Sequence, residues 1–526
     1  MSPASCRDAA ILVALTFAVF APTLSADFVY DARLQILTDP FLHDPRNWLD
    51  VLSFRVLARD VLDFNRPVQL ASLMLDAAIW GREPFGYHLT SILLHCGNVV
   101  LLWLVIRDVL RHGPGGAADD PGGGRWPAFL GAALFAVHPL VTEAVCEPTF
   151  REDLLVAAFS LGAIVLASGT RGGGDLLPAV GSAACCLLAV ASKESGIAAP
   201  VILAAYWRLF RHGEPRRGWL AASGGGAALV AAFVAARFLL EPSPSAIFES
   251  KPAYPGGSFA AAMAIEPRIL ALYAQLIVLP VNLCADYGMP NVAHLPLPVA
   301  LVILAVVATL LVIGGRTDRR IAFGAVLLVV PLVPVSNLVP IYRAAADRYL
   351  YLPLAGAAMI VAALLDSRRL QGSPEAASGS PLQRSQATLV GTLAALVVLG
   401  LACMERQRVW ATQLTLWQDT ARRNPGSYTA AQGLANALHE AGRLAEAEAA
   451  ARMALQLSSG QRGEAWASLA LVLDAQGRTE EADDAVAKAL EVDPRLADPE
   501  ARVRILAMEA AEARELRRLL DRRSSR

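Results

Sequence analysis

Charged residues are scarce in this sequence. Only 18% of the 526 residues are Asp, Glu, Lys or Arg, whereas 55% are apolar, and the mean hydropathy is +0.44. A water-soluble chain of this length needs more polar surface than that. The composition therefore predicts that most of the chain lies in lipid.

Several functional signatures are also missing. No HExxH motif, CxxC pair or glycine-rich phosphate loop in a strand–helix setting occurs, so zinc and nucleotide chemistry are poorly supported, while the use of a divalent metal stays open. The formal net charge is −1 and the basic residues are dispersed along the chain, which argues against a nucleic-acid partner. We interpret the cysteines as small core residues: Cys6, Cys96, Cys146, Cys185, Cys186, Cys284 and Cys403.

Long apolar runs are abundant. A helix needs about 20 apolar residues to cross the hydrocarbon core, and about eleven runs approach that length. They lie near 9–26, 86–106, 127–146, 153–169, 175–192, 196–211, 218–240, 294–314, 320–340, 348–366 and 387–404. A further segment, about 265–284, contains Glu266 and two prolines and is either a span or a helix in the membrane interface.

Alternate loops between these runs are basic. Short loops rich in Lys and Arg mark the cytoplasmic side, which places the N-terminus inside if 265–284 does not cross. The C-terminal region then lies outside. These loops contain Arg107, Arg111, Arg125, Arg171, Arg208, Arg211, Arg216, Arg217, Arg316, Arg319, Arg320, Arg368, Arg369 and Arg384.

The first apolar run has a second interpretation. Arg7 precedes an apolar stretch that ends in Leu24-Ser25-Ala26, as in a secretory signal peptide. The segment after Ala26 faces the non-cytoplasmic side in either case. The abundance of Ala, Gly and Arg indicates a bacterial source, hence an inner membrane with the C-terminal region in the periplasm.

A repeat of 35 residues follows the last run. Gly442 pairs with Gly477, Ala447 with Ala482, and Ala454 with Ala489. Two helix–turn–helix units of tetratricopeptide type are predicted within 427–494, with a helix before them and a charged cap to residue 526. We thus expect an all-α protein with a membrane domain at 1–406, including an external loop at 27–85, and a repeat domain at 407–526. The repeats either dock on the membrane domain or bind a peptide.

Polar residues from distant parts of the sequence fall on the predicted outer face. Charge near the membrane core is costly and is usually retained for pathways or sites, so these residues indicate one shared site. They include Asp31, Arg66, His88, His95, His138, Glu143, Arg151, Glu152, Asp153, Lys193, Glu194, Arg343, Asp347 and Arg348. A histidine before a proline, as at His138, is more often a helix-end residue, and Lys193 and Glu194 are equally well explained as a pair at a helix end.

Seven strings in order carry a family resemblance. They are FVYDARLQI, NRPVQLASLMLD, YHLTSILLHCGNVVLL, LFAVHPLVTEAVCEPTFREDLL, SKESG, YAQLIVLPVNLCADYG and SNLVPIYRAAADRYLYLPLAG. With the repeats that follow, the chain resembles the transmembrane and tetratricopeptide repeat-containing O-mannosyltransferases and their bacterial relatives over nearly its whole length.

The resemblance implies a GT-C glycosyltransferase fold and transfer of a sugar, mannose in the best-known members, from a polyprenyl-phosphate carrier to a protein hydroxyl on the outer face. Asp31 matches the acidic residue after the first span and is the candidate general base. Candidates for binding the donor phosphate are Arg66, Arg151, Lys193, Arg343 and Arg348. Supporting polar residues are His88, His138, Glu143, Asp153 and Glu194. The repeats are candidates for holding a protein acceptor.

One position departs from the family pattern. Many members carry two adjacent acidic residues where this chain has Asp31-Ala32. If the second acid serves a metal or the acceptor, this chain lacks that group; if the first acid is the base, little is lost. Two alternatives remain open at this point, a polytopic transporter or flippase and a non-catalytic membrane-anchored repeat scaffold. Charges on one face favour the enzyme, because a transporter needs polar groups near mid-membrane.

Overall fold

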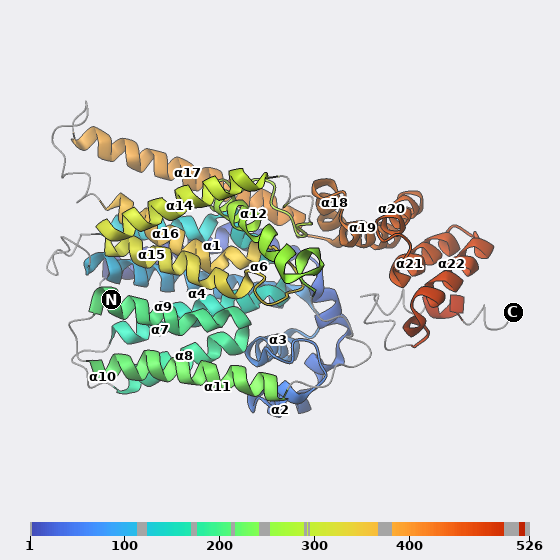
Figure 1. The fold of residues 1–526 in the computed structure, drawn as a ribbon, viewed down its shortest axis with the longest axis horizontal. Coiled ribbons are helices and arrows are strands. Elements are labelled where there is room, and N and C mark those ends of the chain that lie inside the picture. The colour runs from blue at the N-terminus through green and yellow to red at the C-terminus, as the bar shows by residue number, and fades with distance from the viewer. Residues whose placement is uncertain are drawn as a thin grey trace.

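A computed structural model describes residues 3–112, 124–169, 176–211, 216–240, 253–288, 292, 295–366, 381–498 and 515–520. All regular structure in these residues is helical, with no strand. A bundle of long helices is followed by a row of shorter helices that extends from one end of the bundle (Figure 1). The predicted fold class, an all-α polytopic helix bundle, is confirmed.

Seven of the described helices are long and apolar enough to cross a membrane. They lie in Pro3–Ser25 (helix α1, Pro3–Phe20), Pro84–Arg111 (α4), Arg217–Leu240 (α11, Gly225–Leu240), Phe259–Val278 (α12), Leu297–Thr317 (α14), Asp347–Leu365 (α16, Tyr351–Leu365) and Leu389–Val409 (α17, Pro381–Val409). Helices α5 (Arg125–Val137) and Pro139–Cys146, bent by 50° at His138, make an eighth if they are one span.

Four predicted spans form helices that do not meet these criteria of length and apolar composition. Helix α7 (Arg151–Ser168) begins with three charged residues, and α8 (Leu176–Ser192), α9 (Ala199–Tyr206) and α15 (Arg319–Val329) are shorter. They nevertheless lie among the spanning helices, because α7 packs on α4 and α8, and α15 packs on α16 (Figure 1).

Helix α12 covers most of the segment 265–284, for which the sequence did not decide between a membrane span and an interfacial helix. It is long and apolar enough to span, with Pro267 inside it. It runs obliquely near the end of the bundle closest to the C-terminal helices (Figure 1). Sidedness inferred from the basic loops therefore remains a prediction.

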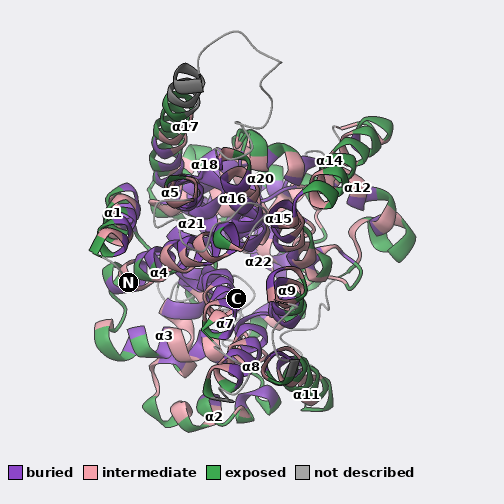
Figure 2. Cartoon of the chain, turned by 90° about the vertical axis from the view of Figure 1, so that its left-hand side faces the viewer, coloured by how far each residue is buried: buried purple, intermediate pink, exposed green. Residues whose placement is uncertain are grey.

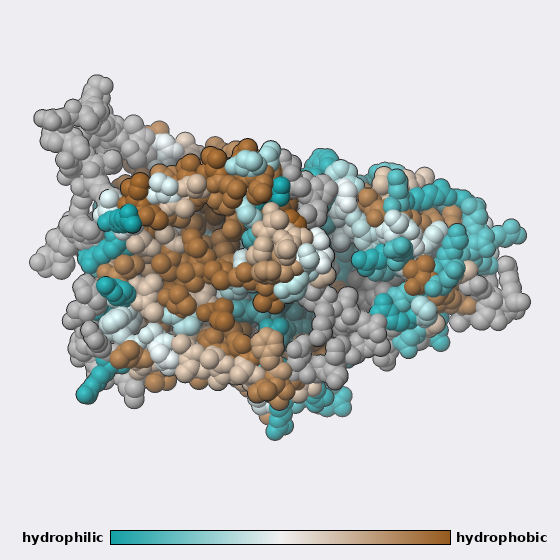
Figure 3. All heavy atoms as spheres, in the orientation of Figure 1, coloured by the Kyte–Doolittle hydropathy of each residue, from teal (hydrophilic) through white to brown (hydrophobic). Residues whose placement is uncertain are grey.

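The outermost helices face lipid. Only 6% of the apolar window of α14 and 11% of that of α17 are buried within the protein. Their outward faces appear as exposed ribbon around a buried centre (Figure 2), and an apolar belt covers the side of the bundle between polar ends (Figure 3). Such a belt matches a hydrocarbon layer, since apolar surface is stable there and unstable in water.

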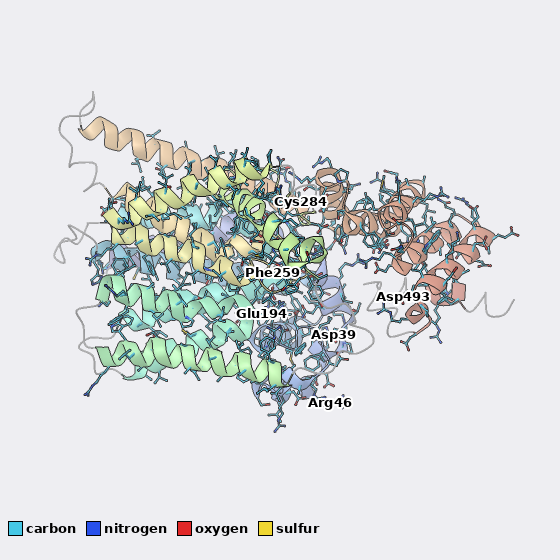
Figure 4. The ribbon with its side chains drawn as sticks, viewed as in Figure 1. Asp39, Arg46, Glu194, Phe259, Cys284 and Asp493 are labelled. Atoms are coloured by element: carbon cyan, nitrogen blue, oxygen red, sulfur yellow. The ribbon has the colours of Figure 1, made fainter. Side chains whose placement is uncertain are left out.

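The segment between α1 and α4, the predicted external loop, is compact and has its own apolar core. It contains α2 (Trp48–Leu52) and α3 (Pro67–Trp80), joined by short helical turns. This core includes Phe28 and Ala32, which flank Asp31 in the sequence. Glu194, Phe259 and Cys284 lie at the same end of the bundle (Figure 4).

The helix boundaries after α17 repeat at the predicted interval. Helix α19 (Tyr428–Glu440) and α21 (Gly463–Ala475) are offset by 35 residues, as are α20 (Leu444–Leu457) and α22 (Thr479–Val492). Gly442 and Gly477 lie in the two turns with φ of 70° and 78°, a left-handed conformation that glycine adopts without strain. Helix α18 (Gln413–Arg423) precedes the pairs. Of the predicted cap, residues 495–498 and 515–520 are described.

The first of these helices pack directly onto the bundle. The main apolar core of the bundle continues into Trp410, Leu416 and Trp417 and on to Ala430 in α19. Arg33 of the external loop pairs with Glu440 at 2.9 Å. The C-terminal helices are therefore joined to the segment that carries Asp31.

Candidate active site

Asp31 lies in a strained turn, next to Tyr30, whose ring makes aromatic contacts. Tyr30 has φ 55°, a conformation that is costly for a bulky residue and must be held by its surroundings. Its ring stacks on Trp417 of α18 at 5.4 Å and meets Phe150 edge-on at 5.7 Å. Tyr30 is buried while Asp31 is exposed, so the turn directs the Asp31 side chain toward solvent.

The Asp31 carboxylate has charged neighbours but no hydrogen-bond partner among the described residues. Desolvation by the surrounding protein raises the pKa of Asp31, although Arg343 and Arg348 act in the opposite direction. Glu152 and Glu143 raise this pKa further, since adjacent negative charge disfavours a second carboxylate. The structure thus brings Asp31 near two of the predicted cations.

Arg348 is held by Glu143. The Glu143 carboxylate accepts hydrogen bonds from the Arg348 guanidinium and from its backbone N–H, and the guanidinium lies 3.9 Å from the Phe150 ring centroid. Helix α6 (Thr142–Cys146) supplies Glu143, and the turn before α16 supplies Arg348. This ion pair orients a largely buried cation beside Asp31.

Arg343 connects the surroundings of Asp31 to the C-terminal helices. Its guanidinium donates to Asp286 at 2.5 Å and lies 5.6 Å from the Tyr30 ring centroid. Asp286 also accepts from the Ser427 hydroxyl at the start of α19, and its backbone carbonyl accepts from Asn424 at 2.9 Å. Asp31, Arg343 and Arg348, with Glu143 and Asp286, are called the Asp31 group below.

A second cluster gathers Arg66, Lys193 and their carboxylates. Arg66 pairs with Asp63 at 2.9 Å, Glu152 at 2.5 Å and Glu194 at 3.2 Å. Lys193 pairs with Glu152 at 3.0 Å and Asp153 at 2.6 Å. We call these residues the Arg66 group. Glu152 connects the two groups, because it faces Asp31 as well.

Acidic residues of the Arg66 group have opposite pKa shifts. Burial raises the pKa of Asp63 to about 6 despite Arg66, and Glu152 and Glu194 add to the rise. Burial also disfavours ionised Glu194, but Arg66 and Arg237 outweigh it and lower its pKa to about 2. Of the three carboxylates around Arg66, Glu152 attracts its charge most strongly, followed by Glu194 and then Asp63.

Arg151 lies apart from both groups. It is fully buried, pairs with Asp76 at 2.5 Å, and donates to the Ser72 hydroxyl and the Tyr87 carbonyl. These contacts join α7 to α3 and α4. The Arg151 guanidinium is engaged in holding helices together and has no surface at which a phosphate could bind.

The histidines are buried in the bundle. His138 accepts from the Leu140 N–H and contacts the Ile277 carbonyl at 3.2 Å, so it terminates α5 in the helix-end role that is usual for such a residue. His95 contacts Tyr351 and the Ala136 carbonyl. His88 is buried near the Asp31 turn, edge-tilted to Phe28 at 6.4 Å. Among the described residues, none of these three histidines forms a hydrogen bond with Asp31.

Glu147 is a residue that the sequence reasoning missed. It is fully buried and accepts three hydrogen bonds, from the Ala32 N–H at 2.8 Å, the Thr149 hydroxyl at 2.6 Å and the Phe150 N–H at 2.8 Å. The first bond anchors the backbone beside Asp31. Burial, with Asp31 adding to it, raises the pKa of Glu147 to about 8. The available signal was a carboxylate before proline within an apolar run.

The described residues contain no group of three or more His, Cys, Asp or Glu side chains arranged to hold a metal ion. Ala32 is buried in the core of the external loop, where its side chain offers no ligand.

No family model matches the chain. A protein O-mannosyl-transferase of Caenorhabditis elegans, F38B6.6, is 27% identical over 373 residues, or 68% of this chain and 51% of its own. Human TMTC1 is 24% identical over 85% of this chain and 55% of its own, and Drosophila melanogaster Tmtc1 is 34% identical over 27% and 16%.

The chain therefore spans about half the length of the relatives that it matches over long stretches. A solved arabinofuranosyltransferase, AftD from Mycobacteria, superposes on 81% of this chain and 29% of its own, with 17% identity and a TM-score of 0.39. The family resemblance is confirmed by the sequence relatives: this chain is similar to protein O-mannosyltransferases of the TMTC family.

Proposed function

We propose that this protein is a membrane glycosyltransferase that moves a sugar, in the first instance mannose, from a polyprenyl-phosphate carrier to a Ser or Thr hydroxyl of a protein. Asp31 acts as the general base. The observation that carries the proposal is that Asp31 is exposed and accepts no side-chain hydrogen bond from the part of the chain that the structure describes, whereas Glu143 and Asp286 are both engaged by arginines.

A single displacement accounts for the chemistry. The acceptor oxygen attacks the anomeric carbon, the bond from that carbon to the phosphate oxygen breaks, and the electron pair leaves with the polyprenyl phosphate. Asp31 takes the hydroxyl proton. Because attack comes from the face opposite the leaving phosphate, the anomeric configuration inverts.

The developing charge on the leaving phosphate requires nearby cations. Arg343 and Arg66 are the most accessible of the candidates, with 28% and 22% of their side chains exposed. Arg348 has 9% exposed and lies beside Asp31. We assign phosphate binding to Arg343, Arg348 and Arg66, and a positioning role to Lys193 and Arg151, whose side chains are only 6% and 0% exposed.

The position of the site in the bundle also bears on its side of the membrane and on the protein acceptor. The site lies at the end of the bundle from which the C-terminal helices extend (Figure 1). We place this end outside, in the bacterial periplasm, because the basic loops lie at the other end. The C-terminal helices contact the Asp31 turn through Trp417 and are suited to present a protein acceptor to it.

The test is sugar transfer by the purified full chain with a peptide acceptor. Polyprenyl-phosphate mannose is compared with GDP-mannose as the donor, using wild type, Asp31→Asn and Asp27→Asn. Asp27 is an exposed carboxylate four residues away and provides the matched control. We expect transfer from the lipid donor alone and its loss only in Asp31→Asn. Transfer that persists in a folded Asp31→Asn variant contradicts the proposal.

A further inference from the structure

A cavity of about 410 Å³ lies at the end of the bundle opposite Asp31. It opens between the start of α1, the last turns of α4 and the end of α7, and α4 packs on both of the other helices. Its apolar lining includes Leu104, Ile164 and Val165, and its polar lining includes Arg107, Arg111 and Asp108. The lining can therefore contact both hydrocarbon and a polar group.

The two arginines carry no carboxylate partner among the described residues. They are four residues apart on α4 and so project from the same side of the helix, where like charges repel. The Arg107 guanidinium rests on the Trp103 ring at 4.5 Å, which fixes its position. Two adjacent, uncompensated cations in one cavity favour an anionic ligand.

The acidic residues nearby are already engaged. Asp108 accepts from Tyr206 and from Arg211 at 3.2 Å, and pairs with His112 at 3.5 Å. Asp8 pairs with Arg125 at 2.7 Å. Asp8 also attracts Arg107 from outside the cavity lining, but its ion pair is with Arg125. The lining therefore holds two arginines and one carboxylate, Asp108, which is paired with other residues.

We propose that this cavity binds the headgroup of an anionic phospholipid from the adjacent leaflet, with its phosphate on Arg107 and Arg111 and its acyl chains along the apolar side. Basic pockets between membrane helices near a membrane surface suit such headgroups. A soluble anion would leave the apolar lining of the cavity without a contact. This site is distinct from the Asp31 group and does not depend on the proposed function.

Thermal unfolding of the detergent-purified full chain tests the assignment. Phosphatidylglycerol should raise the midpoint by several degrees more than phosphatidylcholine does, because a ligand of the folded state stabilises it. R107Q/R111Q should lose that difference, with lipid affinity weakened on the order of tenfold or more. R107K/R111K, which keeps the charge, should retain most of it.

The matched control is R217Q/R316Q. These arginines are exposed, carry the same charge and lie at the same end of the bundle outside the cavity lining. An equal loss in the control, an equal rise with both lipids, or the same rise with inorganic phosphate alone would overturn the proposal. Native mass spectrometry, which counts bound phosphatidylglycerol, separates a lost ligand from a variant that is merely unstable.

Discussion

The protonation state of the Asp31 carboxyl group is expected to set the pH dependence of transfer. A general base acts only when ionised, and the surrounding protein raises the pKa of Asp31 above its ordinary 3.8. The rate constant kcat/KM should therefore fall with decreasing pH at a midpoint above 3.8. Arg343 lowers this pKa, so Arg343→Gln should move the midpoint to higher pH.

The control for that profile is Arg46→Gln. Arg46 lies on the same external loop with 88% of its side chain exposed, and its ion-pair partner is Asp44. Its removal should leave the midpoint unchanged. A midpoint that does not respond to Arg343→Gln would show that Asp31 does not govern the acid limb.

Glu147 should stabilise the Asp31 turn. Glu147→Ala removes the side-chain acceptor of the Ala32 and Phe150 N–H groups, which keep only their longer bonds to the Val29 and residue-147 backbone carbonyls, at a cost of about 0.5–1.5 kcal/mol each. We expect a lower thermal midpoint and reduced transfer, whereas Glu147→Gln, which keeps one acceptor oxygen, should lose less. Equal midpoints for wild type and Glu147→Ala would exclude this role.

The pKa of Glu147 gives a second expectation. Folding raises it from 4.5 to about 8, so the folded state retains a proton that the unfolded chain releases. The contribution to stability is full below pH 4.5 and is lost as the pH rises through 8. Thermal midpoints measured across this range should decline, and Glu147→Gln should flatten the decline.

Single residues were the least predictable part of the site. The strings around Asp31, Arg66, Arg343 and Arg348 gave candidates, yet no local pattern reveals that Arg151 faces Asp76 or that Lys193 lies between Glu152 and Asp153. Those pairings join residues up to 75 positions apart and exist only after the helices pack. Glu147 was missed for the same reason, because its partner at Ala32 is 115 residues away.

At the scale of elements, Asp286 is the contact through which α19 reaches Arg343. Asp286→Asn weakens both the ion pair with Arg343 and the hydrogen bond from Ser427, since the neutral amide is a poorer acceptor. We expect faster amide hydrogen exchange in α18 and α19 and lower transfer. Glu405→Gln, which removes an exposed pair with Arg408, should change neither. Unchanged exchange in Asp286→Asn would show that this contact does not hold the helices.

Periodicity predicted most helices and the spacing of the C-terminal pairs, because buried alanines and turn glycines leave a local signal. It did not fix which helices are long enough to span. Helix α7 illustrates the limit: its first turn carries Arg151, Glu152 and Asp153, which look unsuited to a membrane until their partners in other helices are known.

At the scale of the whole molecule, the proposed orientation places Cys6 and position 46 on opposite sides of the membrane. Cys6 is exposed at the start of α1, at the end of the bundle opposite the external loop. In intact cells, a membrane-impermeant thiol reagent should label an Arg46→Cys variant directly and Cys6 only after permeabilisation. A Cys6→Ser background isolates the signal at position 46. The reverse pattern would contradict the orientation.

The measurement that tests the central claim most directly is single-turnover transfer with the lipid donor already bound. A base that acts on the acceptor proton contributes to the chemical step and not to donor binding, and such groups contribute about 10²–10⁴-fold to the rate. For Asp31→Asn we predict a rate lower by that factor with a donor Kd close to that of wild type. An unchanged rate, or a loss that is wholly accounted for by weaker donor binding, would contradict the account.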